Sequence, residues 1–116
     1  MPLEARIETL PERTAVITLS GAMTLGSSLK LVDSQVQSAL STGVTTLIFD
    51  LSAVDYADSA GLGLLVHTFG LMNEKGGSLR LCGVQPRLRA MMQTTRTDTI
   101  LTIDGSRDES LAALKA

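Results

Sequence analysis

Aromatic residues are scarce in this sequence, with two phenylalanines, one tyrosine and no tryptophan among 116 residues. Proteins that bind nucleic acids commonly stack bases on aromatic side chains and attract phosphates with basic patches. This chain has neither feature, because its formal net charge is −2 and its lysines and arginines form no run. We therefore expect no nucleic-acid partner. With a hydrophobic content of 44%, the core must be built from aliphatic side chains and methionine.

Cysteine and long apolar runs are also lacking. The single cysteine, Cys82, excludes an internal disulfide and is typical of a reducing cytosol. Its apolar neighbours predict a buried strand residue, with a reactive thiol as the less favoured alternative. No stretch reaches the roughly 18 apolar residues of a membrane span, and the N-terminus has no basic and then apolar signal segment. The sequence predicts one cytoplasmic domain over residues 1–116, without membrane insertion.

The sequence carries few of the residue combinations that enzymes use for catalysis, phosphate binding or metal binding. The only histidine, His67, lies eight residues after Ser59 on the same predicted helix, about 12 Å away and too far to act as its base. The sequence has no Gly-x-Ser-x-Gly motif, which carries the nucleophilic serine of many hydrolases. It also lacks the Gly-x-x-x-x-Gly-Lys-Ser/Thr motif that binds nucleotide phosphates. Asp50, Asp55 and Asp58 could hold a cation loosely, although such residues are more often turn and cap formers. We expect no catalytic activity, no cofactor and no metal site.

The segment from residue 45 to residue 77 predicts a strand, a short loop and a helix. Residues 45–49 are apolar, β-branched and aromatic, as in a buried strand. Asp58 and Ser59 stand where a helix needs its N-cap, and Gly76 with Gly77 suits a left-handed C-cap. At about 100° per residue, the predicted core side of the helix carries Leu62, Leu65, Val66, Phe69 and Met72.

A second face of this helix begins at Ser59 and continues with small residues, the histidine and two outer leucines: Gly63, Leu64, His67, Gly70 and Leu71. The first turn of a helix has unpaired N–H groups and the positive end of the dipole, so a phosphate on Ser59 would be tolerated there. The face is either a docking surface or a place where other parts of the domain pack. Asp58 and Ser59 could equally serve only as caps.

The flanking segments predict further strands and helices. A hairpin is expected from residues 2–10 and 14–20, the second strand being apolar on both faces and therefore central. A helix is expected after a loop at residues 21–24, with Thr24 as its N-cap and Leu25 opening its apolar stripe. Further along, strands are expected at 78–82 and 99–103, a helix from Pro86, and a C-terminal helix from a capping box at 106–109.

The resulting order is β-β-α-β-α-β-α-β-α. Strands that alternate with helices favour a mainly parallel sheet with right-handed crossovers. The N-terminal hairpin adds an antiparallel edge to that sheet. The expected fold class is therefore α/β, a mixed sheet with helices packed on it.

The motif at the start of the central helix also resembles a known family. Asp58-Ser59-Ala60-Gly61-Leu62-Gly63, preceded by Asp50-Leu51-Ser52 and Val54-Asp55-Tyr56, resembles the signature of the STAS domain, the family of anti-sigma-factor antagonists and their relatives. The similarity extends from about Arg6 to the C-terminus. It implies a STAS-like sheet and a phosphoacceptor serine at Ser59.

The resemblance implies a function as an anti-sigma-factor antagonist. The unphosphorylated domain would bind an anti-sigma factor that is also a serine kinase, and phosphorylation of Ser59 would switch binding off until a phosphatase removes the phosphate. The loop Gly21-Ala22-Met23-Thr24 would lie beside the phosphoacceptor. The family usually carries an acidic residue where this chain has Thr24, a departure that bears on partner recognition. We expect a monomer or a weak dimer.

The predicted partner interface combines that loop, the helix start at Asp58, Ser59 and Ala60, and the helix face over residues 63–71. Three other functions stay open. The chain could be a STAS subunit of another assembly, such as a stress-signalling complex or a lipid-transport ATPase, in which Ser59 is not modified. It could also be a small enzyme or nucleotide-binding protein, or a structural adaptor.

Overall fold

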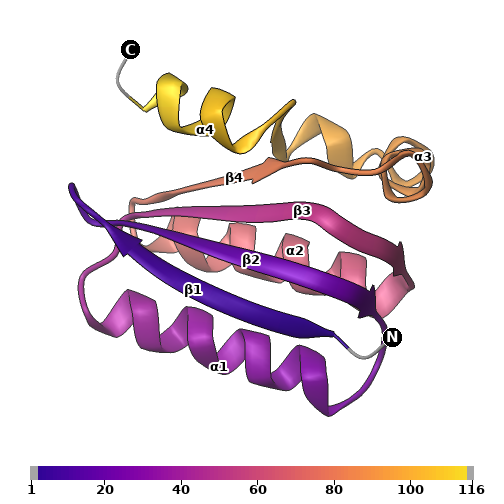
Figure 1. Cartoon of the computed structure of the whole chain (residues 1–116), viewed down its shortest axis with the longest axis horizontal. Helices are drawn as coiled ribbons and strands as arrows, with labels where there is room; N and C mark the ends of the chain where they lie inside the picture. The colour runs from indigo at the N-terminus through magenta and orange to yellow at the C-terminus, as the bar shows by residue number, and fades with distance from the viewer. Residues whose placement is uncertain (1–2, 115–116) are drawn as a thin grey trace.

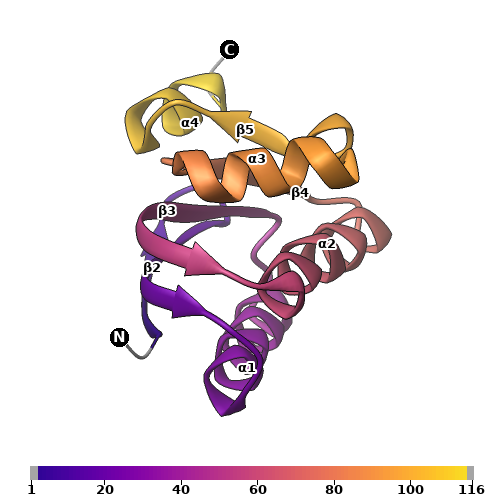
Figure 2. The ribbon, with the colours of Figure 1, turned by 90° about the vertical axis from the view of Figure 1, so that its right-hand side faces the viewer.

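The strands of the sheet follow the order of the sequence. The computed structural model describes residues 3–114, and within them five strands lie side by side as β1-β2-β3-β4-β5, of which Figure 1 labels β1 to β4 and Figure 2 labels β5. Their bounds are β1 Glu4–Leu10, β2 Thr14–Met23, β3 Thr46–Ala57, β4 Ser78–Cys82 and β5 Thr102–Asp104. β1 is antiparallel to β2, and the other neighbours are parallel. The predicted fold class and N-terminal hairpin are confirmed, although Pro2 of the predicted first strand lies outside the described residues.

Helices cover both faces of the sheet (Figure 2). α1 (Ser27–Ser41) and α2 (Ser59–Glu74) lie on one face, and α4 (Arg107–Ala113) lies on the other. α3 (Pro86–Thr95) contributes buried residues to the same core as α1 and α2. α2 ends before Gly76, whose φ of 73° provides the left-handed turn that the sequence predicts there.

The sheet separates two apolar clusters. The larger cluster includes Ile17 of β2 and Phe49 of β3 and is covered by α1 and α2. The smaller cluster, on the α4 face, consists of Val16, Ile48 and Cys82. Because β2 and β3 contribute to both, these strands are buried on both faces, as predicted for central strands. Burial raises the pKa of the Cys82 thiol to about 11, so this cysteine is the inert strand residue that the sequence predicts.

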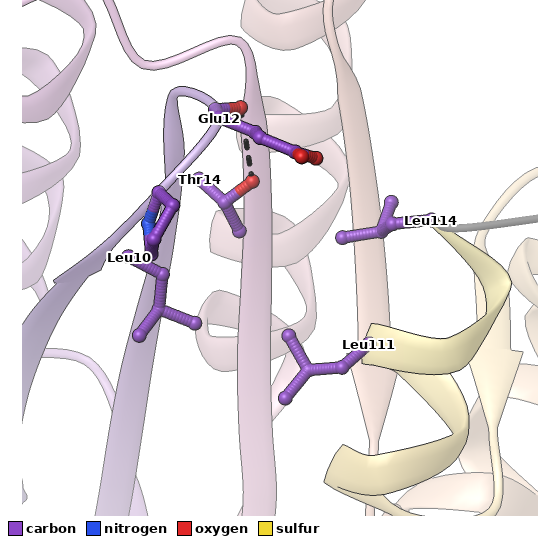
Figure 3. Close-up of a pocket in the computed structure, with 6 residues that line it drawn as sticks. Leu10, Glu12, Thr14, Leu111 and Leu114 are labelled. Atoms are coloured by element: carbon purple, nitrogen blue, oxygen red, sulfur yellow. Dashed lines mark hydrogen bonds between the residues drawn. The ribbon is translucent and has the colours of Figure 1, made fainter.

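A pocket of about 320 Å³ opens between α4 and the turn that joins β1 to β2 (Figure 3). Its lining is mainly apolar and comprises Leu10, Pro11, Glu12, Thr14, Leu111 and Leu114. The hydroxyl of Thr14 donates to the carbonyl of Glu12 at 3.2 Å, so it does not offer a free donor to a ligand. Thr14 begins β2 opposite Thr46 of β3, whereas Ser59 follows the end of β3. The pocket therefore lies at the opposite end of the sheet from Ser59.

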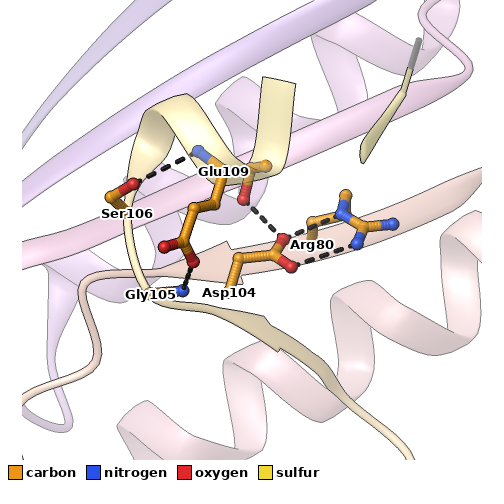
Figure 4. Close-up of polar contacts among 6 residues, drawn as sticks. Arg80, Asp104, Gly105, Ser106 and Glu109 are labelled. Carbon is orange, nitrogen blue, oxygen red and sulfur yellow. Dashed lines mark hydrogen bonds and ion pairs between the residues drawn. The ribbon is translucent and has the colours of Figure 1, made fainter. Parts of the chain in front are cut away.

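Hydrogen bonds to Asp104 of β5 connect that strand with β4 and with α4 (Figure 4). Arg80 of β4 donates through Nε and Nη2 to the two carboxylate oxygens of Asp104, at 2.8 and 3.1 Å. The buried hydroxyl of Ser110 donates to the same carboxylate at 2.6 Å. At the start of α4, Ser106 accepts the N–H of Glu109, whose own carboxylate accepts the N–H of Gly105, close to the predicted capping box.

Two strands are longer than the sequence pattern predicts. β3 continues through residues 50–57, where the pattern predicts a loop, and β2 continues to Met23. These extensions pair with each other, from Gly21 opposite Val54 to Met23 opposite Ala57. Register shifts interrupt the ladder, so the side chains do not alternate regularly and the sequence carries no clear strand signal. The expected loop at residues 21–24 is therefore mostly strand.

Two other boundaries also differ from the prediction. α1 begins at Ser27 with Gly26 as its N-cap. The φ of Gly26 is 155°, a non-helical backbone conformation that glycine adopts easily, so the helix cannot begin before Ser27. Thr24 is thus not the cap, and Leu25 is 83% exposed instead of opening the buried stripe. The last strand has only three residues, since the 3₁₀ helix η1 (Thr97–Thr99) occupies the start of the segment predicted as strand.

Candidate functional site

Ser59 is the first residue of α2 and its side chain is exposed. The N-cap is Asp58, whose Oδ1 accepts the N–H of Gly61 at 2.9 Å. Asp58 therefore performs the capping that the sequence could assign to either residue. The hydroxyl of Ser59 is left at the surface, in the first turn of a 16-residue helix, where backbone N–H groups and the dipole favour negative charge.

The second carboxylate oxygen of Asp58 reaches another part of the chain. Oδ2 accepts the N–H of Leu25 at 3.0 Å, and the N–H of Asp58 itself donates to the carbonyl of Met23 at 3.1 Å. The N–H of Leu25, followed by that of Gly61, lowers the pKa of Asp58, so the group is ionised at neutral pH. One carboxylate thus joins the start of α2 to the segment before α1.

Gly61 makes a close backbone contact at the same place. A Cβ added at Gly61 would lie 2.8 Å from the Cβ of Met23 and would collide with the carbonyl of Met23. Only glycine therefore lets the first turn of α2 approach the end of β2. This contact explains the glycine of the Asp58-Ser59-Ala60-Gly61 motif in structural terms.

The exposed face of α2 carries three of the residues predicted to lie beside Ser59, namely Gly63, His67 and Gly70. Among the described residues, no atom outside the helix lies within 4 Å of a Cβ built on Gly63 or Gly70, so these glycines do not accommodate a neighbouring element. Nε2 of His67 lies 3.7 Å from Oδ1 of Asp33 on α1, which orients the histidine toward that helix. The alternative that these glycines serve internal packing is not supported.

Three residues assigned to the partner interface are buried instead. Leu64 is 8% exposed and belongs to the main core, Met23 is fully buried, and Gly21 is buried within β2. The assignment of Leu64 was wrong because α2 is apolar on almost every side. The helical period alone therefore did not show which side faces inward.

The actual buried side of α2 is rotated from the predicted one. It comprises Gly61, Leu62, Leu64, Leu65, Thr68 and Met72. Val66 and Phe69, which were predicted in the core, are half-buried. The remaining predicted interface residues are also half-buried: Ala22, Thr24, Asp58, Ala60 and Leu71.

Two apolar side chains beside the site were not predicted to be exposed. Leu25, held through its N–H by Asp58, is 83% exposed, and Tyr56 near the end of β3 is 41% exposed. The guanidinium of Arg87 lies 5.1 Å from the centre of the Tyr56 ring, which is cation–π distance. Gly26 was the available signal for Leu25, because a glycine followed by serines suits a helix start two residues later than Thr24 suggests.

The part of the chain that the structure describes contains neither a metal-binding cluster nor a helix that could span a membrane. Within residues 3–114, no three histidine, cysteine or acidic side chains gather as a metal site would require. None of the helices in that part of the chain combines the length and apolar character needed to cross a bilayer. The site offers the exposed hydroxyl of Ser59, the ionised carboxylate of Asp58 and the exposed side chain of Leu25.

Comparison with protein families decides the classification. The model of the STAS domain matches residues 6–110. The chain belongs to the STAS domain family. In this STAS domain, the matched region includes all five strands except the first residues of β1, together with α1, α2 and α3.

Individual relatives of this STAS domain are known by sequence and by structure. The anti-sigma F factor antagonist of Paenibacillus polymyxa is 26% identical over 69 residues, which cover 60% of this chain and 59% of that protein. The anti-sigma-B factor antagonist of Bacillus subtilis is 36% identical over 58 residues, 50% of this chain and 53% of that protein. The aligned region thus spans little more than half the length of each relative.

The fold also matches a solved STAS structure in two states. The anti-sigma factor antagonist SpoIIAA in its unphosphorylated form is similar with a TM-score of 0.79 and 21% identity, over 97% of this chain and 99% of that chain. Its phosphorylated form from Bacillus gives a TM-score of 0.77 and 20% identity, over 96% and 99% of the two chains. At this identity, the similarity establishes the fold.

Proposed function

We propose that this STAS domain is an anti-sigma-factor antagonist that is switched by phosphorylation of Ser59. The unphosphorylated form binds an anti-sigma factor with serine-kinase activity and releases the sigma factor, and the phosphorylated form does not bind. The supporting observation is the exposed hydroxyl of Ser59 at the first position of α2, free of the capping that Asp58 performs. The names of the sequence relatives support the same function. The protein then acts in the cytoplasm as a binding module, not as an enzyme, and a phosphatase resets it.

The docking surface that we propose differs from the one that the sequence predicts. It consists of exposed residues around the start and outer face of α2, namely Leu25, Ser59, Gly63, His67 and Gly70. Leu25 provides an exposed apolar anchor, and the two glycines keep the helix face flat. Met23, Gly21 and Leu64 support this surface from below and do not contact the partner.

The switch follows from charge and hydration. A phosphate on Ser59 adds about −1.5 to −2 charges and a strongly hydrated group next to the ionised Asp58. The free energy needed to remove water from these charges against a partner exceeds the binding free energy that the contacts of this surface contribute. The backbone of α2 accommodates the phosphate in the free protein, so the fold itself is retained.

Kinase treatment tests the proposal directly. The protein is incubated with candidate anti-sigma kinases and ATP, and its mass is measured before and after. We expect one phosphate, mapped to Ser59 and abolished by Ser59→Ala. The matched control is Ser27→Ala, because Ser27 is also an exposed first residue of a helix and should leave phosphorylation unchanged.

Binding of the two forms to the same kinase completes the test. The unphosphorylated protein should bind and the phosphorylated protein should not. Phosphate on another serine, or equal binding of both forms, would contradict the proposal. An unmodified protein that co-purifies with a transporter ATPase would indicate instead a STAS subunit of another assembly.

A further inference from the structure

β1 forms one edge of the sheet and pairs only with β2 among the described strands. Its seven residues, from Glu4 to Leu10, are extended, so their outward N–H and C=O groups form a row that another strand can join. The strand is not covered on its outer edge by β5, which lies at the far side of the sheet. This edge is therefore a candidate interaction surface.

The two faces of β1 have different characters. Ile7 lies opposite Ile17, a residue of the main core, so its side chain is on the face covered by α1 and α2. It is nevertheless 41% exposed, because it stands at the rim of the sheet. Arg6 and Glu8 lie on the opposite face and are exposed.

We propose that two copies of this protein pair through β1 in an antiparallel manner, with Ile7 opposite Ile7 at the two-fold axis. Ile7 is the central residue of the strand, so this register pairs all seven residues of each copy. It places Arg6 of each copy opposite Glu8 of the other, on the same face of the combined sheet. The strand is thus complementary in charge to itself.

Neighbouring registers are unfavourable. A shift by one residue would mismatch the alternating inward and outward backbone groups of the two strands. A shift by two residues in one direction places Arg6 opposite Arg6 and Glu4 opposite Glu8. The same shift in the other direction places Glu8 opposite Glu8, and like charges directly opposite each other destabilise a strand pair.

Charges on an edge strand commonly prevent pairing, but here their pattern selects one register. The carboxylate of Glu8 is already oriented by Arg107 of α4, whose Nη2 lies 2.9 Å away. That contact holds Glu8 on the face where Arg6 of the second copy would arrive. The ladder is short, so we expect a weak dimer whose population depends on concentration.

This interface is separate from the proposed docking surface, because β2 lies between β1 and the strand that leads to Ser59. The dimer is consequently independent of whether Ser59 is phosphorylated. Its test requires neither a kinase nor an anti-sigma factor.

Sedimentation velocity from about 1 µM to 1 mM provides the test on the whole chain. We expect the parent protein to show a reversible monomer–dimer equilibrium. Arg6→Glu and Glu8→Lys should each weaken dimerisation at least tenfold, because each places like charges opposite one another. Lys30→Glu is the control for Arg6→Glu, since it reverses an exposed charge on α1 and should not change dimerisation.

Mixing the two variants gives the sharpest result. In a mixed dimer, the glutamate introduced by Arg6→Glu faces the lysine introduced by Glu8→Lys in the other copy. On the other side of the two-fold axis, the retained Glu8 of the first variant faces the retained Arg6 of the second, so both pairs are attractive. We therefore expect the mixture to dimerise more strongly than either variant alone, with thermal melting confirming that each is folded. A parent protein that stays monomeric at the highest concentration, or an Arg6→Glu variant that dimerises normally, would overturn the proposal.

Discussion

The carboxylate of Asp58 and the backbone N–H of Leu25 are joined by a 3.0 Å hydrogen bond across 33 positions of the sequence. The same carboxylate caps α2 through Gly61. The residue before the proposed phosphoacceptor thus holds both the helix and the exposed leucine beside it. Its two oxygens can be tested separately by substitution.

Asp58→Asn should separate the cap from the contact to Leu25. An asparagine oxygen can still accept the N–H of Gly61, whereas its NH₂ group cannot accept the N–H of Leu25. We expect faster amide hydrogen exchange at Leu25 with a small loss of stability. Asp58→Ala loses both contacts and should cost about 0.5–2 kcal/mol. Equal exchange at Leu25 in Asp58→Asn and the parent would show that the contact does not order this segment.

Gly63→Glu should block the partner without unfolding the domain. Gly63 is exposed with open space around it, and glutamate is a better helix former than glycine. The variant should melt at or above the temperature of the parent and bind the proposed anti-sigma-factor partner at least tenfold more weakly, a loss of about 1.4 kcal/mol. Unchanged binding measured by calorimetry would remove this face from the docking surface.

Gly61→Ala should behave in the opposite way. Its added methyl group meets Met23, so the variant should lose stability by about 1–3 kcal/mol, as overpacked sites do. Urea unfolding measures this difference. A variant as stable as the parent would mean that the start of α2 can move away from β2 at little cost.

Leu25→Ser should reduce binding and leave stability unchanged, because this leucine is 83% exposed and buries little in the free protein. The matched control is Ile100→Ser, at an apolar residue that is 47% exposed and lies outside the proposed surface. We expect at least a tenfold loss of affinity for the first variant and none for the second. Equal affinities for the two variants would contradict the role of Leu25 as an anchor.

The Arg80–Asp104 pair should make the free energy of unfolding decrease as the pH falls in the acidic range. The hydrogen bonds from Arg80, followed by that from Ser110, hold the pKa of Asp104 below its ordinary value of 3.8. A lowered folded-state pKa gives stability that is complete above the unfolded-state pKa and is lost as the pH falls through the folded-state value. Asp104→Asn should be less stable than the parent near neutral pH, and the difference should shrink below about pH 4. Chemical denaturation at several pH values measures this, and a constant difference would refute the linkage.

The sequence was sufficient to predict the strand and helix order, because the apolar runs and the glycine and proline positions agree with one another. It also placed Ser59 at the start of a helix, since Asp58 and Ser59 precede a long apolar stretch. It could not orient that helix, because leucines occur on several of its sides. Leu64, predicted on the outer face, is therefore buried, and Val66, predicted in the core, is only half-buried.

Long-range pairing explains the other differences. Residues 50–57 extend β3 along residues 18–23 of β2, from Thr18 opposite Asp50 to Met23 opposite Ala57, and no local pattern records that partnership. The backbone N–H of Leu25 is likewise held by Asp58, a residue 33 positions further along the chain.

The contact between Gly61 and Met23 has a consequence for how this protein can diverge. The distance between the first turn of α2 and the end of β2 is set by the contact between the backbone of Gly61 and the backbone carbonyl of Met23, because Gly61 has no side chain. Substitutions in the aliphatic core would change the melting temperature before they displaced the hydroxyl of Ser59. Core substitutions away from this contact can thus change stability while Ser59 keeps its place at the start of α2.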